Sequence, residues 1–231
     1  MKALLYKEFK LAMHPICYVF IAMFPLMILI PSYPIAIGFI YVLTCYPVLF
    51  LGANKGQQSN DLLYSTLLPI RKKDIVKARI MTVLIMHLVF IALTSLLYPV
   101  ALMINSGITE SAIAEDPNAN PITNAGLGLN SYVLVLAIVM VGFALADLIF
   151  FPIYYKNGKS IVMSTLLMIL GFVVYLGVLT IGLPYIPGLE WINDLSLYIQ
   201  FIALAVSLVI YALLHLLVYK ISSKRLEKVD F

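Results

Sequence analysis

Residues 80–104 read IMTVLIMHLVFIALTSLLYPVALMI and contain no Asp, Glu, Lys or Arg. A transmembrane helix needs about 20 mainly apolar residues, so this stretch is long enough to cross a bilayer. Five similar runs occupy Pro15–Pro31, Ile35–Leu51, Tyr132–Ile153, Ile161–Leu183 and Leu197–Tyr219. The sequence therefore predicts an all-α polytopic membrane protein, with six transmembrane helices in a single domain over 1–231.

The composition excludes a soluble domain. Of the residues, 63% are hydrophobic and 11% are charged, whereas soluble domains carry about 25% charged residues. Cys17 and Cys45 both lie inside apolar runs, where we interpret them as small core residues rather than as a disulfide framework. The net charge of +4 is spread over four segments beside span ends, which favours contact with lipid headgroups over nucleic-acid binding.

All fifteen Lys and Arg residues fall on one side of the membrane once the apolar runs are taken as spans. They lie in 1–14, 52–79, 154–160 and 220–231, and the alternate connections 105–131 and 184–196 contain none. By the positive-inside rule, both termini face the cytoplasm. Prolines crowd 15–51, so a re-entrant hairpin there is an alternative to two full spans.

Residues 1–14 precede the first span. Leu5, Phe9 and Ala12 share one helical face, and Lys7 and Lys10 lie opposite. We expect a helix lying in the membrane interface, with its lysines at the headgroups. The alternative is a plain basic flank of the first span.

The connection 52–79 has features of an ordered loop. Breaker and polar residues lead into a short helix predicted over Asp61–Leu68, which Pro69 ends. Asp61 at its start suits the helix dipole. The basic cluster Arg71–Lys73 and Asp74 then precede the third span.

Few polar groups lie within the spans. Asp147 is the acid within a span, and we expect it to reach toward water and pair with Lys156 or Lys159, with a transport role as the alternative. His87 and His215 each stand alone in an apolar helix and are interpreted as packing residues. We therefore expect no catalytic residue and no metal site.

The segment 157–160 ends like a phosphate-binding loop, but Ile153 stands where the leading glycine must be. The residues before it also form a membrane helix rather than a strand. The chain is therefore expected to bind no nucleotide, to hold no cofactor and not to be an enzyme.

Two cytoplasmic stretches resemble a known family. LPIRKKDIVKAR at 68–79 is similar to a leucine-proline, arginine and isoleucine-valine element of the membrane subunits of type-two ABC exporters. FPIYYKNGK at 151–159 is similar to that family's proline, aromatic, glycine and basic pattern after the fourth span. The layout of the spans and the N-terminal helix resemble the small six-span bacterial permeases of this family. Among these, the chain is similar to the exporters of phenol-soluble modulins.

The resemblance implies a permease in a bacterial plasma membrane, paired with a second copy or a sibling. It also implies a separate cytoplasmic ATPase that binds ATP and Mg. It also implies that the loop 52–79 carries a coupling helix that contacts the ATPase. The matching coupling residues are Asp61, Leu62, Leu63, Tyr64, Leu67, Arg71, Lys72, Lys73 and Asp74.

The cargo implied is amphipathic or hydrophobic, such as a peptide toxin or an antimicrobial peptide, with no cargo-contact residue assigned. The outer segment 184–196 has the Pro and Gly content that a re-entrant gate permits. The alternative functions are a six-span channel, a secondary carrier or a lipid-modifying protein without an ATPase, or a structural subunit of another membrane complex.

Overall fold

The computed structural model describes residues 2–13, 15–29, 38, 41–42, 65, 69–115, 132–157, 161–179 and 196–229. Regular structure in these residues is entirely helical. The elements are α1 (Lys2–Lys7), the π-helix η1 (Glu8–Ala12), α2 (Ile16–Leu26), the 3₁₀-helix η2 (Met27–Leu29), α5 (Lys72–Glu115), α6 (Tyr132–Asn157), α7 (Ile161–Gly177) and α8 (Leu197–Glu227). The all-α prediction is confirmed for this part of the chain.

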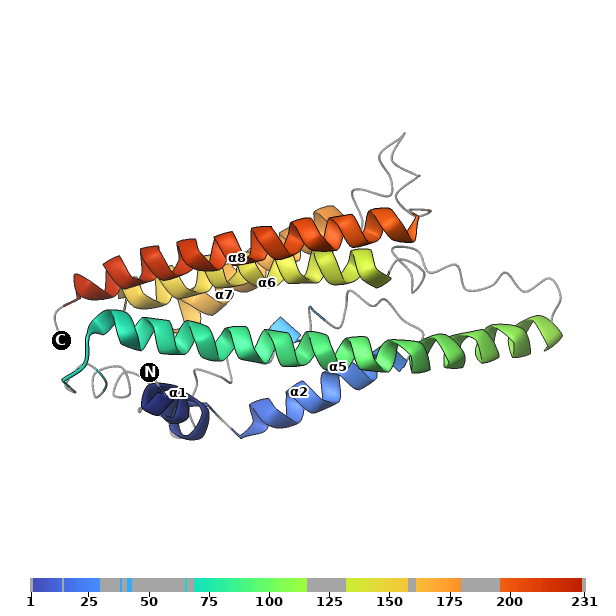
Figure 1. Cartoon of the computed structure of the whole chain (residues 1–231), viewed down its shortest axis with the longest axis horizontal. Coiled ribbons are helices and arrows are strands. Elements are labelled where there is room, and N and C mark those ends of the chain that lie inside the picture. The colour runs from blue at the N-terminus through green and yellow to red at the C-terminus, as the bar shows by residue number, and fades with distance from the viewer. Residues whose placement is uncertain are drawn as a thin grey trace.

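The long helices form a bundle with α6 at its centre. Figure 1 shows α5, α6 and α8 running side by side, and α6 packs against both α7 and α8. Helix α5 also packs against α8 and α2. Phe143, Phe150 and Phe151 of α6 are fully buried. Both chain termini lie at the end of the bundle where α5 begins (Figure 1).

Three helices of the described residues are long and apolar enough to cross a membrane. They are Lys72–Ile104, Tyr132–Lys156 and Leu197–Glu227, and shorter apolar helices cover Ile16–Leu29 and Val162–Tyr175. These correspond to five of the six predicted spans. Most of the second predicted span, Ile35–Leu51, lies outside the described residues, so the choice between two spans and a hairpin stays a prediction, as does the total of six.

Several helices extend beyond the predicted spans. Helix α5 begins at Lys72 rather than at Ile80 and continues past Ile104 to Glu115. The added residues at its outer end contain helix-forming residues and no proline, so nothing stops the helix there. Helix α8 likewise continues to Glu227, where Lys224 and Arg225 suit the negative end of the helix dipole.

Helices α6 and α7 meet through glycines. A Cβ atom on Gly142 would lie 2.7 Å from Cε2 of Phe172, and one on Gly171 would lie 2.4 Å from Cδ1 of Ile149. Small residues at such positions let membrane helices approach closely.

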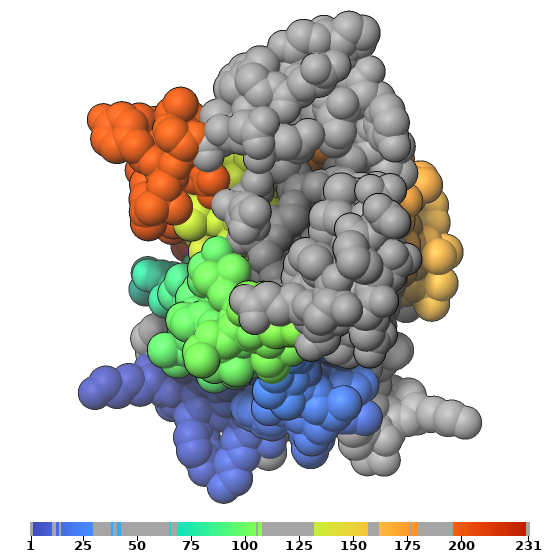
Figure 2. Space-filling model, turned by 90° about the vertical axis from the view of Figure 1, so that its right-hand side faces the viewer, coloured from blue at the N-terminus to red at the C-terminus, as the bar shows by residue number. Residues whose placement is uncertain are grey.

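In Figure 2, α7 and α8 occupy opposite sides of the molecule. Exposed Leu, Ile, Val and Phe side chains cover much of α8, which suits contact with lipid.

Candidate functional site

The basic residues gather at one end of the bundle. In the described part of the chain, they lie in α1 and η1, in the first turns of α5, and near the ends of α6 and α8. Figure 1 places these segments together at the end that carries both termini. We call this region the basic end. Its predicted cytoplasmic orientation stays a prediction.

The coupling residues divide into two groups. Five of them fall outside the described residues: Asp61, Leu62, Leu63, Tyr64 and Leu67. Arg71 immediately precedes α5, and Lys72, Lys73 and Asp74 form its first turn. Arg71 Nε donates to Asp74 Oδ2 at 3.2 Å, while the Arg71 side chain remains 86% exposed. The basic cluster therefore begins a membrane helix and is not part of a separate loop.

The first turn of α5 is tied to the end of α8. Lys72 Nζ donates to the backbone oxygen of Val229 at 2.7 Å. Lys73 Nζ lies 3.1 Å from Glu227 Oε1 in an ion pair that is about half exposed. Arg225 in turn donates to the backbone oxygen of Pro152 at 2.7 Å, which joins α8 to α6. A displacement at the start of α5 would therefore reach α6 and α8 directly.

A buried ion pair joins the N-terminal segment to the same helix. Arg79 donates from Nε to Glu8 Oε2 at 2.9 Å and from Nη2 to Glu8 Oε1 at 3.3 Å. Its Nη1 donates to the Tyr154 hydroxyl at 3.1 Å. All three residues are at most 5% exposed. This two-pronged geometry is the strong form of the arginine–carboxylate contact, and it connects η1, α5 and α6.

The sequence analysis did not identify the contact between Glu8 and Arg79. The signal was present, because Glu8 is the one acid among three lysines before the first span. The N-terminal helix is confirmed, but Lys7 does not reach outward as expected. Its side chain is 14% exposed, and its amine contacts Glu8 and donates to the Ser65 hydroxyl.

A second polar cluster lies in the bundle core, where α5 and α6 each supply one residue and α8 supplies two. His215 Nε2 lies 2.7 Å from Asp147 Oδ2, and His87 Nδ1 lies 3.9 Å from the same oxygen. The Tyr211 hydroxyl lies 3.1 Å from His87 Nδ1. Asp147 and His87 are fully buried and His215 is 5% exposed. We call His87, Asp147, His215 and Tyr211 the core cluster.

The core cluster overturns two expectations from the sequence. Asp147 is fully buried and pairs with His215, so it does not extend to water. Lys156 is nine positions further along the same helix, about 13 Å away, and Lys159 lies outside the described residues. His87 and His215 are not isolated either, because the helices bring both to one carboxylate. The tertiary contact could not be derived from single-helix patterns.

Both ring nitrogens of His215 face oxygen acceptors. Nδ1 lies 2.8 Å from the backbone oxygen of Tyr211, and Nε2 faces the Asp147 carboxylate. Nε2 of His215 and Oδ2 of Asp147 lie 2.7 Å apart, a distance that requires a proton between the two atoms, so His215 and Asp147 share one. Tyr211 and His215 are four positions apart on one helical face, a spacing that could have indicated this partner.

The core cluster lies deep in the spans. His87, Asp147 and His215 each lie 10 to 15 residues from the basic end of their helix, or about 15–22 Å at the rise of an α-helix. The hydrocarbon core of a bilayer is about 30 Å thick. Ionisable groups at such a depth are rare and usually carry function.

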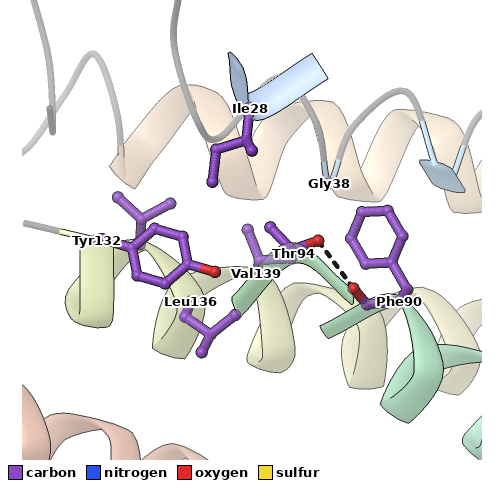
Figure 3. Close-up of a pocket in the computed structure, with 8 residues that line it drawn as sticks. Ile28, Gly38, Phe90, Thr94, Tyr132, Leu136 and Val139 are labelled. Atoms are coloured by element: carbon purple, nitrogen blue, oxygen red, sulfur yellow. Dashed lines mark hydrogen bonds between the residues drawn. The ribbon is translucent and has the colours of Figure 1, made fainter. Parts of the chain in front are cut away.

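A small pocket lies between η2, α5 and α6, toward the other end of the bundle. Figure 3 shows Ile28, Phe90, Tyr132 and Val139 around it. Thr94 also lines the pocket, but its hydroxyl donates to the backbone oxygen of Phe90 at 2.8 Å. The pocket is therefore almost wholly apolar. It offers contact to an apolar group and little to orient a polar one.

Comparison with known proteins identifies a family. A model of the protein family described as "ABC-2 family transporter protein" matches residues 3–223. The match runs from α1 to the last turns of α8 and so includes the basic end and the core cluster. No curated protein and no solved structure matches the chain.

Proposed function

The chain belongs to the ABC-2 transporter family, and from this premise we propose that it is the permease subunit of an ATP-driven exporter of amphipathic or hydrophobic peptides. A separate cytoplasmic ATPase would bind ATP and Mg and power it, and the chain would pair with a second copy or a sibling permease. The family is one of membrane transporters, which indicates a permease subunit of an ABC transporter. The peptide cargo, the ATPase contact and the dimer are our proposals.

The observation that carries the proposal is the set of contacts that join the helices at the basic end. The first turn of α5 lies within the predicted coupling loop 52–79, with the exposed Arg71 just before it and the tethered Lys72 and Lys73 in it. An ATPase that contacts this turn would meet a basic surface that is already bonded to the end of α8. Movement of the turn would be passed on to α8.

The transmission to the rest of the bundle follows from the buried ion pair. Arg79 is two helical turns after Lys72 and holds both Glu8 and Tyr154. Because a buried pair of this geometry resists separation, η1 and α6 would move together with the start of α5. ATP-driven closure of two ATPase subunits could then shift several helices at once. In this mechanism the chain itself hydrolyses no ATP.

A single charge reversal tests the ATPase contact. Arg71→Glu changes a side chain that is 86% exposed and contacts Asp74 three residues further along the chain, so the fold should tolerate it. We expect at least a tenfold loss of copurified ABC ATPase from the membrane extract, because like charges at an interface oppose association. The matched control is Lys224→Glu, which makes the same charge change on the exposed side of α8. Equal ATPase recovery from both variants would contradict the contact at α5.

The cargo class needs a separate measurement. Inside-out vesicles containing the permease and its ATPase should accumulate a fluorescent amphipathic helical peptide when ATP is present. A scrambled peptide of the same composition should not accumulate, because it has no apolar face to enter the inner leaflet. Equal uptake of both peptides would remove amphipathicity as the selected property. Uptake of neither, by vesicles with normal ATP hydrolysis, would remove peptides as the cargo.

A further inference from the structure

The core cluster takes no part in the proposed transmission of movement, although its three ionisable residues converge from three helices. We propose that His87, Asp147 and His215 bind one divalent transition-metal ion of the Zn²⁺ type, with the Tyr211 hydroxyl beside the site. The spacing of these residues in sequence predicted no metal site. Their arrangement in the bundle points to one.

The distances suit a four-coordinate ion after small adjustments. One ligand atom from each of the three residues lies within 4.8 Å of the other two. Ligands of tetrahedral Zn²⁺, bound at about 2.1 Å, stand about 3.4 Å apart. The contact from His215 Nε2 to Asp147 Oδ2 is 2.7 Å and that from His87 Nδ1 is 3.9 Å, so one must lengthen and the other shorten.

The ligand nitrogen of His215 is already oriented. A histidine that binds a metal through one nitrogen usually donates its other N–H to a backbone carbonyl or a carboxylate. Nδ1 of His215 lies 2.8 Å from the backbone oxygen of Tyr211, which fixes the ring and leaves Nε2 pointing at Asp147. The metal ion would take the place of the proton that His215 and Asp147 now share.

The ligand set indicates which ions would bind. Two imidazoles and one carboxylate suit Zn²⁺, Co²⁺, Ni²⁺ and Cu²⁺, whereas Mg²⁺ and Ca²⁺ prefer oxygen ligands alone. Binding of the ion at His87 Nδ1 would break the contact of that nitrogen with the Tyr211 hydroxyl, now 3.1 Å away, and leave the hydroxyl as a further oxygen ligand. Since the ligands belong to α5, α6 and α8, a bound ion would join three spans. Metal binding would therefore stabilise the folded bundle.

The test uses the full chain in detergent, with a purification tag that contains no histidine. After chelator treatment and removal of the chelator, CoCl₂ and ZnCl₂ are titrated separately. We expect the visible absorption of four-coordinate Co²⁺, saturating at one equivalent and bleached by Zn²⁺, together with a rise in Tm of several degrees. MgCl₂ should leave both unchanged.

Variants locate the site. Asp147→Asn and His215→Asn each keep a hydrogen-bonding group but remove a metal ligand, so Kd for Co²⁺ should rise at least tenfold. The matched control is His14→Ala, which removes the remaining histidine of the chain and should bind as the parent does. Circular dichroism of each variant checks that the helices are retained.

The parent protein alone can overturn the proposal, whether or not the variants fold. Failure of the parent to take up one equivalent of Co²⁺ would exclude the site, and the core cluster would then be a proton-sharing contact only. Uptake that survives in both folded variants, or is lost in His14→Ala, would place the ion elsewhere and equally overturn the assignment.

Discussion

The basic end and the core cluster solve the same problem of placing charge in an apolar bundle, but they solve it differently. At the basic end, permanent charges meet their opposites, as Arg79 meets Glu8, and nearby lysines remain in contact with water. In the core cluster, Asp147 faces two histidines that can be neutral or charged, and water is excluded. Depth in the bundle therefore determines which partner a carboxylate needs. Near the end of the bundle that partner is an arginine, and in the middle it is a titratable or metal-binding group.

The largest effect should come from removing the contact between Asp147 and His215. In the metal-free protein, His215→Ala should lower the free energy of unfolding by about 3–5 kcal/mol, because the buried carboxylate then loses its partner at 2.7 Å. Unfolding in detergent, followed by circular dichroism, measures the loss. Replacing both Asp147 and His215 by Leu should recover much of it. A double variant as unstable as the single one would mean that the pair's packing, rather than its charge, stabilises the bundle.

Removing the cation at the basic end should cost less. Arg79→Met leaves the buried Glu8 with Lys7, whose amine lies 3.8 Å away, so we expect a loss of about 2–3 kcal/mol and faster hydrogen exchange in α1 and η1. Tyr154→Phe removes one hydrogen bond of the same group and should cost about 1 kcal/mol. If exchange in α1 stays slow in Arg79→Met, the N-terminal segment is held by apolar contacts instead.

A purely steric change calibrates these polar effects. Gly142→Ala would force Phe172 and Tyr175 to move, since the new Cβ would lie 2.7 Å from one ring and 3.0 Å from the other. We expect a loss of about 1–2 kcal/mol from overpacking. Gly107→Ala is the control, because nothing lies within 4 Å of its added Cβ. That variant should be as stable as the parent or more so.

The smallest effect belongs to the exposed pair at the start of α5. Lys73→Ala removes the ion pair with Glu227, whose side chains are 56% and 44% exposed, and should change stability by less than about 0.5 kcal/mol. Any loss should vanish at high salt. The exchange variant, Lys73→Glu with Glu227→Lys, should restore it. A loss as large as that of Arg79→Met would show that exposure does not separate the two contacts.

The helices were largely predictable because lipid imposes a length and a hydropathy that single segments display. The starts of α6 at Tyr132, α7 at Ile161 and α8 at Leu197 agree with the sequence analysis. The ends agree less well, because a helix that leaves the membrane continues until a breaker stops it, and neither 105–115 nor 220–227 contains a strong one. These two polar segments were predicted as a loop and a tail, but they continue the helices.

The sites were predictable as residues but not as partners. The sequence analysis selected Asp147, His87 and His215 because ionisable groups within spans are rare. Which helices bring them together depends on the packing of α5, α6 and α8, and no pattern within one helix encodes it. Arg79 was missed for the opposite reason, since a basic residue at a span end is ordinary until its buried acid partner is known.

The 44 residues of α5 make a rod about 66 Å long, more than twice the thickness of the hydrocarbon core. His87 divides that rod unequally, with about 22 Å toward Lys72 and about 42 Å toward Glu115. If α5 tilts about the core cluster, a displacement of Lys72 at the basic end produces a displacement about twice as large at Glu115. Spin-label distances from each end of α5 to α8 would measure this gain. Pro99 lies on the long arm, where its missing N–H lets the rod flex and absorb part of the stroke.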